Sequence, residues 1–299
     1  MGALPNVIVI GVTKCGTSAL HYFLDLHPEI AMSHPKELNY FMDEVWVDGT
    51  VAISTSEELR DIESTPRNWS RGLDWYSGHF SSKAPVRGES SARYTAPWFP
   101  GVPERIASVA PEAKLILMVR DPVERALSHH SFLRAEGRES RNAPEALTPP
   151  DNIYVVRSRY FEALARFREH FQSSSILVAS QEDLRAAPER TMRTIYEFLG
   201  VYQGFSTQKL TRQRHRTVGK GRRYRAAQQL LSLPVARLAY RLPEEVKWGL
   251  ERLVSRPAAR AETPVPPDDP LRARLADQLR PDAERFREAT GRAFAEWSV

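Results

Sequence analysis

The sequence contains very little cysteine, since Cys15 is the only one in 299 residues. One cysteine cannot form an internal disulfide, so the composition favours a reducing compartment, and we expect a cytoplasmic protein. No apolar run approaches the roughly 18 residues of a membrane-spanning helix. The N-terminus lacks the charged segment of a secretory signal, and a first strand begins at Val7. The 8 histidines show no metal-ligand spacing, so we expect no bound metal.

A strong excess of charge is also lacking, since the chain has 42 Lys and Arg residues, 37 Asp and Glu residues and a net charge of +5. This mild basic excess favours anionic ligands and does not require nucleic acid. A hydrophobic fraction of 41% is enough for a substantial core, and 299 residues can form one large domain or two small ones.

Residues 7–20 are the most informative stretch. Four apolar residues at 7–10 predict a buried strand, a glycine-bounded turn follows, and Leu20, Phe23 and Leu24 lie on one face of the next helix. A strand, a glycine-containing loop and a helix N-terminus form an anion cradle, because free backbone N–H groups and the helix dipole both point at the loop.

The loop is similar to the nucleotide-binding pattern G-x-x-x-x-G-K-[ST] but departs from it at the lysine. Gly11 and Gly16 keep the glycine spacing, Ser18 keeps the hydroxyl, and Thr17 stands where lysine is expected. The lysine is instead Lys14, inside the loop, where it would lie beside a single phosphate and the group bonded to it. The cradle therefore suits a 5′-phosphate with one transferable group. An ordinary strand–turn–helix with a solvated lysine is the alternative.

Strands and helices alternate along the rest of the chain. We predict strands at 30–33, 86–90, 115–119 and 176–179, and helices at 122–132, 157–171, 188–199 and beyond 270. This alternation predicts an α/β fold with a mainly parallel, doubly wound sheet. Ligands of such sheets bind at the carboxyl ends of the strands.

Three stretches lack a regular pattern. Residues 42–84 are irregular with scattered aromatics, and form either a binding wall or lid, or a peripheral insert packed by its own rings. Residues 136–152 are charged and contain prolines, which predicts a loop. Residues 256–270 are rich in proline and predict a surface connector rather than a domain linker.

Arg120 and Ser128 predict a second phosphate contact. Arg120 ends the strand at 115–119, and Ser128 lies about two turns into the next helix, so the two side chains can grip one phosphate from two sides. An ion pair of Arg120 with Asp121 or Glu124 is the alternative.

A second basic feature lies at 212–225, which holds seven Lys or Arg residues and no acid. Its centre is Lys220, Gly221 and Arg222, and the glycines favour a loop that can close on an anion. A nucleic-acid-binding function is open, but a short run without an aromatic platform supports it poorly.

Glu37, in the loop after the first helix, is the candidate general base, with Glu89 and His34 as the next candidates. Asn39 offers an amide beside it. No second aspartate follows a strand as in magnesium-dependent NTPases, which weakens a magnesium-nucleotide function.

In this order the motifs resemble the 3′-phosphoadenosine 5′-phosphosulfate (PAPS)-dependent sulfotransferases, and among them the branch that includes heparan sulfate sulfotransferases and many bacterial relatives. Residues 14–19 resemble the family's 5′-phosphosulfate loop, residues 120–128 its 3′-phosphate motif and residues 220–222 its late cofactor loop. The resemblance covers most of the chain except about 42–84 and 226–265. It implies one P-loop-like α/β domain over 1–299 that transfers a sulfuryl group from PAPS to a hydroxyl of a carbohydrate or small natural product without a metal.

The resemblance also implies residue roles. Lys14 would stabilise the leaving 5′-phosphate and Glu37 would be the base. The residues implied to bind PAPS are Lys14, Cys15, Gly16, Thr17, Ser18, Ala19, Arg120, Ser128, Lys220, Gly221 and Arg222. Asn39, Ser90 and Tyr94 would face the acceptor, but Asn39 stands where heparan-type members often have histidine and Ser90 where some have lysine. The acceptor is therefore not predicted.

Two other function classes are retained for comparison. A P-loop small-molecule kinase would depend on magnesium, and a basic nucleic-acid-binding module would show a steep salt dependence on oligonucleotides.

Overall fold

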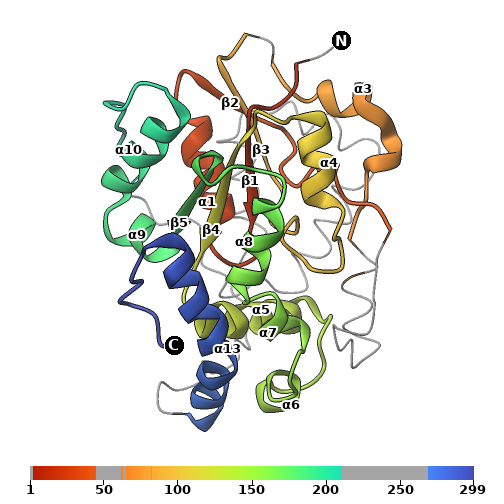
Figure 1. Ribbon diagram of the computed structural model, residues 1–299, viewed down its shortest axis with the longest axis vertical. Helices are drawn as coiled ribbons and strands as arrows, with labels where there is room; N and C mark the ends of the chain where they lie inside the picture. The colour runs from red at the N-terminus through yellow and green to blue at the C-terminus, as the bar shows by residue number, and fades with distance from the viewer. Residues whose placement is uncertain (1–2, 45–61, 63–64, 82, 211–268) are drawn as a thin grey trace.

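The computed structural model describes residues 3–44, 62, 65–81, 83–210 and 269–299. Within them a five-stranded sheet has the order β2-β3-β1-β4-β5, and every pair of neighbouring strands is parallel (Figure 1). The strands are β1 (Val7–Gly11), β2 (Ile30–Met32), β3 (Val86–Ser90), β4 (Lys114–Val119) and β5 (Ile176–Ser180). The predicted parallel α/β sheet is confirmed, and each predicted strand is present.

The two central strands are apolar on both faces. All five residues of β1 are buried, and so are the last five of β4, as expected for a parallel sheet covered by helices on both sides. β1 lies between β3 and β4, with Ile8 opposite Glu89 and Leu115. Because all strands point the same way, the segments that follow β1, β3 and β4 meet at one edge.

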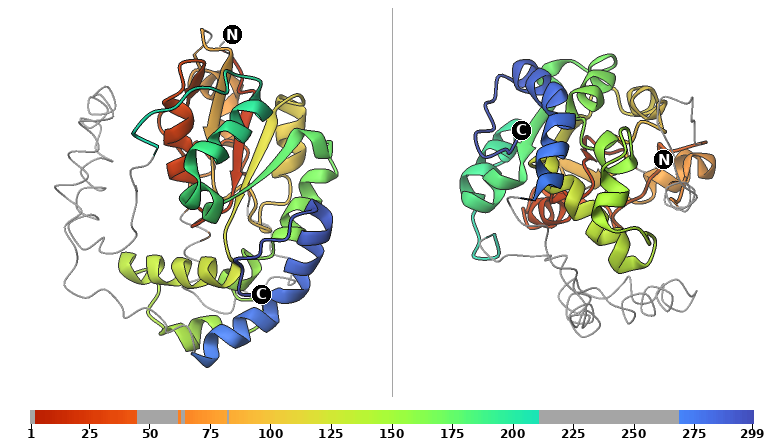
Figure 2. Two further views of the ribbon diagram at one scale, coloured as in Figure 1. Left: turned by 90° about the vertical axis from the view of Figure 1, so that its left-hand side faces the viewer. Right: turned by 90° about the horizontal axis from the view of Figure 1, so that it is seen from below.

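Helices cover both faces of the sheet. α1 (Thr17–Asp25) and α10 (Pro188–Leu199) lie on one face, and α4 (Val102–Val109) and α8 (Tyr160–Arg168) on the other (Figure 2). α5 (Pro122–Glu136) lies across the carboxyl edge, and α13 (Pro270–Thr290) packs against α5 and α8. Gly200, at φ 78°, ends α10 as predicted, because glycine adopts the left-handed conformation at little cost.

The described part of residues 42–84 is partly regular, with η1 (Trp69–Arg71) and α3 (Gly72–Ser77). Tyr76 of α3 stacks on Tyr40, with ring centroids 4.1 Å apart and planes 9° apart. The expectation of a wholly irregular stretch was therefore wrong for these residues. Residues 45–61 lie outside the described residues, and so does most of the predicted connector 256–270.

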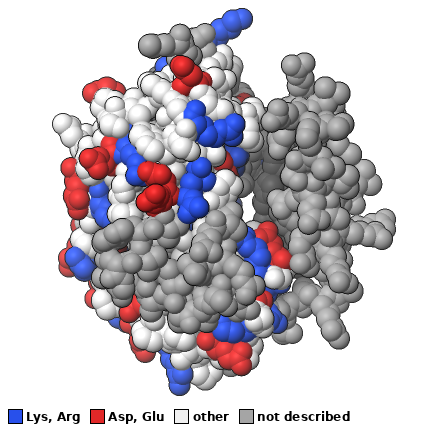
Figure 3. Space-filling model, turned by 90° about the vertical axis from the view of Figure 1, so that its right-hand side faces the viewer, with Lys and Arg blue, Asp and Glu red and all other residues white. Residues whose placement is uncertain are grey.

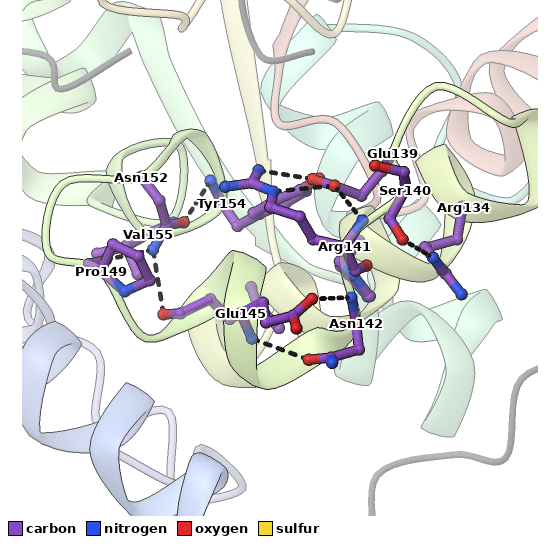
Figure 4. A network of polar contacts seen from close by, with 12 residues as sticks. Arg134, Glu139, Ser140, Arg141, Asn142, Glu145, Pro149, Asn152, Tyr154 and Val155 are labelled. Carbon is purple, nitrogen blue, oxygen red and sulfur yellow. Dashed lines mark hydrogen bonds and ion pairs between the residues drawn. The ribbon is translucent and has the colours of Figure 1, made fainter. Parts of the chain in front are cut away.

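The prediction of a loop at 136–152 was wrong in part, because α6 (Ala143–Leu147) lies within it and α7 (Ile153–Val156) follows. Asn142 and Glu145 form a capping box: Glu145 N–H donates to Asn142 Oδ1 (3.0 Å), and Asn142 N–H donates to Glu145 Oε2 (3.1 Å) (Figure 4). Buried Glu139 accepts hydrogen bonds from Arg141 and from the hydroxyl of Tyr154, both at 2.7 Å. Burial alone would raise the pKa of Glu139, but these bonds outweigh it and lower the pKa to about 2.

The remaining elements are short. They are η2 (Ser173–Ser175) before β5 and α9 (Gln181–Ala186) directly after it. The helix predicted at 157–171 begins only at Tyr160, since Arg157 is the C-cap of α7.

Candidate functional site

The loop between β1 and α1 forms the centre of the site. Gly16 has φ 90° and is the N-cap of α1, and no described side chain caps this helix start. The first N–H groups of a helix have no partner within the helix, and the dipole makes this end positive. The start of α1 therefore has the geometry of an anion cradle, and anion binding by this loop stays a prediction.

Gly16 has a left-handed backbone conformation and also lies close to the side chain of Gln181. A Cβ there would lie 2.9 Å from Nε2 of Gln181, at the start of α9. Gln181 is thus a wall of the loop that the sequence analysis did not assign to the site. Its Oε1 atom is buried and has no hydrogen-bond partner among the described residues. Because this oxygen is an acceptor, it could be satisfied only by an N–H or O–H donor and not by a phosphate oxygen.

Lys14 is held at the left-handed φ of 75°. Its ammonium lies 4.1 Å from the ring centroid of Phe132 on α5, a cation–π distance. Phe132 lies one turn beyond Ser128 on α5, so Lys14 reaches the helix that carries the predicted 3′-phosphate contact. The structure thus brings Lys14 and the part of α5 near Ser128 together.

The thiol of Cys15 points into the core rather than toward a ligand. The side chain is fully buried, and its Sγ lies 3.6 Å from the hydroxyl of Tyr160. Burial raises the pKa of Cys15 to about 11, so it has none of the character of a reactive thiolate. Its backbone N–H donates to Val12 O (3.1 Å). The thiol of Cys15 is therefore not available to contact a nucleotide in the loop.

Arg120 makes the ion pair that the sequence leaves open as an alternative. Its Nη2 lies 3.0 Å from Oε2 of Glu124, and the other oxygen of Glu124 binds Arg272 of α13. The Arg120 side chain, in the turn between β4 and α5, is 14% exposed, and Ser128 of α5 is partly exposed. Asp121, the other candidate partner, caps α5 by accepting from Glu124 N–H (2.9 Å). Lys220, Gly221 and Arg222 lie outside the described residues.

Glu37 belongs to the loop after β2 and lies beside the last residue of β3. Its N–H donates to Ser90 O (3.0 Å), and its Oε2 accepts from Ala92 N–H (3.1 Å). The carbonyl of the same Ala92 accepts from the hydroxyl of Thr13 (3.2 Å), next to Lys14 in the first loop. One residue therefore joins the carboxylate of Glu37 to the loop. The Glu37 side chain is 36% exposed and also ion-pairs with Lys36.

The three predicted acceptor-facing residues are buried. Ser90 Oγ lies 2.9 Å from His21 Nδ1, and the hydroxyl of Tyr94 donates to Glu89 (2.8 Å). Asn39 is 4% exposed, and within the part of the chain that the structure describes its buried Oδ1 has no hydrogen-bond partner. Of the three, Asn39 has the side chain best suited to contact a hydrogen-bond donor on a substrate.

The two other candidate bases differ from Glu37 in exposure. Glu89 is fully buried, and burial raises its pKa to about 7 in spite of hydrogen bonds from Tyr76, Tyr94 and Ser91. His34 is exposed, with Nε2 at 3.2 Å from Asp25 Oδ2. Glu37 combines solvent access with a link to the loop, which neither of the others has among the described contacts.

Charges of both signs lie on one face of the described part of the molecule. On the face shown in Figure 3, Lys and Arg side chains are interspersed with Asp and Glu. Among the described helices, none has the length and apolar character needed to cross a membrane. The described residues also contain no group of three or more His, Cys, Asp and Glu arranged to hold a metal.

A parallel sheet in which the first strand leads through a glycine-containing loop to a helix N-terminus is a P-loop-like α/β fold. The sulfotransferase family model matches residues 5–203, well over half of the chain. The chain therefore belongs to the sulfotransferase family, and it is a transferase acting on sulfur-containing groups. The predicted family and reaction class are confirmed, and the kinase alternative is not favoured.

Two curated proteins and one solved structure are similar to this chain. Human bifunctional heparan sulfate N-deacetylase/N-sulfotransferase 2 is 29% identical over 252 residues, covering 74% of this chain and 26% of that protein. The Xenopus laevis bifunctional heparan sulfate N-deacetylase/N-sulfotransferase 1 is 27% identical over 212 residues, covering 66% and 22%. The chain thus spans about a quarter of the length of these relatives. The crystal structure of a sulfotransferase from Alicyclobacillus acidocaldarius has the same fold, with a TM-score of 0.67, 22% identity and coverage of 99% and 100%.

Proposed function

We propose that this sulfotransferase takes its sulfuryl group from PAPS and transfers it to a hydroxyl of a carbohydrate or small natural product, without a metal. Family membership supports the reaction class. The observation that carries the assignment of roles is the pair of hydrogen bonds through Ala92, which ties Glu37 to the loop of Lys14. We further propose one domain over residues 1–299, and the single cysteine supports a cytoplasmic location.

The residues around the loop suit a nucleotide that carries phosphates at the 3′ and 5′ positions of its ribose. The N–H groups of Gly16, Thr17 and Ser18 would hold the 5′-phosphate at the start of α1. Arg120 and Ser128, together with residues 220–222, would hold the 3′-phosphate. When bound, PAPS supplies an activated sulfuryl group on its 5′-phosphate, and the protein supplies position and charge.

The transfer needs one group on each side of the sulfur. The acceptor oxygen forms a bond to sulfur while the bond between sulfur and the 5′-phosphate oxygen breaks. Glu37 takes the acceptor proton, and the Lys14 ammonium stabilises the negative charge left on the phosphate oxygen. The product nucleotide is adenosine 3′,5′-bisphosphate.

The donor is tested by thermal shift of the full chain in EDTA. Adenosine 3′,5′-bisphosphate should raise the melting temperature, and AMP should raise it much less, because AMP lacks the 3′-phosphate. Equal shifts would remove the 3′-phosphate site. Larger shifts with ATP and Mg²⁺ would instead favour a kinase, and binding of oligonucleotides with a steep salt slope would favour the nucleic-acid function.

The two catalytic roles predict that substitutions of Lys14 and Glu37 differ in their effect on nucleotide binding. Lys14→Ala and Glu37→Gln should both lower turnover severely: loss of the electrostatic donor at Lys14 costs on the order of 3 kcal/mol, and loss of a general base at Glu37 costs about 10²–10⁴-fold. Only Lys14→Ala should weaken the bisphosphate in calorimetry, because Glu37 lies on the acceptor side. Near-native turnover in Glu37→Gln would assign the base elsewhere. The acceptor panel should contain amino sugars as well as hydroxyl compounds, since the named relatives are N-sulfotransferases.

A further inference from the structure

The loop that carries Glu37 and Asn39 has an unusual backbone. Glu37 has φ 63° and Asn39 has φ 48°, so two residues with side chains lie in the left-handed region two positions apart. Residues other than glycine adopt this region rarely, and they keep it only where the surrounding structure holds them. The contacts that hold this loop therefore decide where Glu37 and Asn39 lie.

Alternate amides of the loop donate to the end of β3 and the residues after it. Glu37 N–H donates to Ser90 O (3.0 Å), Asn39 N–H to Ser91 Oγ (3.0 Å) and Phe41 N–H to the hydroxyl of Tyr94 (3.4 Å). The first acceptor is a backbone carbonyl, but the other two are side-chain hydroxyls. A hydroxyl accepts in a fixed direction only if its own proton is directed elsewhere.

Glu89 directs both of those protons. Ser91 Oγ donates to Glu89 Oε2 (2.9 Å), and the hydroxyl of Tyr94 donates to Glu89 Oε1 (2.8 Å). Tyr76 of α3 donates to Oε1 as well (2.7 Å). The carboxylate thus takes donors on both oxygens and turns the lone pairs of Ser91 and Tyr94 toward the loop amides.

A carboxylate can accept all of these hydrogen bonds, and without them its buried charge would be unfavourable. Glu89 is fully buried, and its described polar contacts are the three hydroxyls, with no cation among them. Burying a charge without an opposite charge is unfavourable unless hydrogen bonds satisfy it. A glutamine would place N–H donors against one of the hydroxyls and disturb the arrangement, although it has nearly the same shape.

We propose that Glu89 is a positioning residue: through Ser91 and Tyr94 it holds the loop 37–41 in the conformation that presents Glu37 and Asn39 to the acceptor. This inference rests on the proposed function of Glu37 as the base. Glu89 does not touch the reacting groups itself. Its effect reaches them through two hydroxyls and the backbone of the loop.

Hydrogen–deuterium exchange tests this on the full chain at pH 8, where Glu89 is largely ionised. Glu89→Gln, Ser91→Ala and Tyr94→Phe should each speed exchange of the 37–41 amides by about twofold to tenfold, the loss of roughly one hydrogen bond. Tyr76→Phe is the matched control, because it removes a donor to the same carboxylate but no acceptor of a loop amide. Exchange in α10 should stay unchanged in all four.

Kinetics and calorimetry complete the test. The three variants should lower turnover by about tenfold to a hundredfold, as a misplaced catalytic group does, with bisphosphate affinity near native. Unchanged exchange at 37–41 in Tyr94→Phe and Ser91→Ala, or equally faster exchange throughout the protein, would overturn the inference even if Glu89→Gln fails to fold. If Glu37→Gln is inactive while Ser91→Ala and Tyr94→Phe are fully active, the positioning role is wrong. If Glu37→Gln itself stays active, the proposed base is wrong, and the exchange result still decides what Glu89 holds.

Discussion

The cation predicted to bind the 3′-phosphate already has a carboxylate partner. Arg120 pairs with Glu124, and Glu124 pairs in addition with Arg272. A phosphate that approaches Arg120 would compete with Glu124, which could keep its contact with Arg272. The pair therefore orients the guanidinium at little cost, since partly exposed ion pairs contribute about 0–1 kcal/mol.

Substitutions at this pair should separate binding from structure. Arg120→Ala should weaken adenosine 3′,5′-bisphosphate by roughly 1.5–3 kcal/mol, the range for a hydrogen bond to a charged group, and leave AMP nearly unchanged. Glu124→Gln is the matched control, and it should preserve or improve bisphosphate affinity because it removes the competing charge. Calorimetry with both nucleotides measures this. Equal losses for the bisphosphate and AMP in Arg120→Ala would make Arg120 structural.

Single residues of the site show which properties a sequence can reveal. The spacing of Gly11, Lys14 and Gly16 is local, and it predicts the loop that the structure contains. The burial of Cys15 is not local, because the thiol packs on Tyr160, which is 145 positions away. Ala92, which links Glu37 to the loop, is 79 positions from Thr13 and 55 positions from Glu37. Such contacts depend on the order of the strands in the sheet, which the sequence does not state.

At the scale of elements, the strands were the easiest to predict. β1, β4 and β5 are apolar runs bounded by polar or glycine residues, and the parallel sheet buries β1 and β4 on both faces and the edge strand β5 in part. The long helices α5, α10 and α13 have a proline in the first turn and a glycine just past the end, and their predicted existence is confirmed.

The short helices were predicted poorly because their ends decide whether they form. α6 has five residues and depends on the capping box of Asn142 and Glu145, a signal that is present in the sequence but was not used. The start of α8 has no such local signal. Its N–H groups at Phe161 and Glu162 donate to the carboxylate of Asp282 in α13, at 3.0 and 3.1 Å. A cap supplied from about 120 positions away appears only once the fold is known.

At the scale of the whole molecule, several buried groups couple folding to pH. Burial raises the pKa of Glu89 from 4.5 to about 7 and that of Asp282 from 3.8 to about 6. Burial also lowers the pKa of His21 from 6.5 to about 3. The folded state therefore holds extra protons on the two carboxyls and lacks one on the histidine. Below about pH 6.5 the two carboxyls make the unfolding free energy fall as pH rises, and His21 makes it rise. Above about pH 6.5, Glu89 is the main one of the three groups that still changes the unfolding free energy with pH.

The contribution of Glu89 should appear as a loss of stability with rising pH. Between pH 4.5 and about 7 the folded state binds the proton and the unfolded state does not, so the unfolding free energy falls as pH rises. The full shift corresponds to at most about 3 kcal/mol. Urea unfolding of the native chain and Glu89→Gln at several pH values from 5 to 8 measures it.

The difference in unfolding free energy between the native chain and Glu89→Gln cancels the titration of His21 and Asp282, because both proteins contain these groups. That difference should fall by about 1–3 kcal/mol from pH 5 to pH 8, with equal denaturant slopes in the two proteins. A difference that is constant over this range would mean that Glu89 ionises alike in the folded and unfolded states. The carboxylate would then be charged well below pH 7, and it would direct the hydroxyls of Ser91 and Tyr94 over the whole pH range in which the enzyme is assayed.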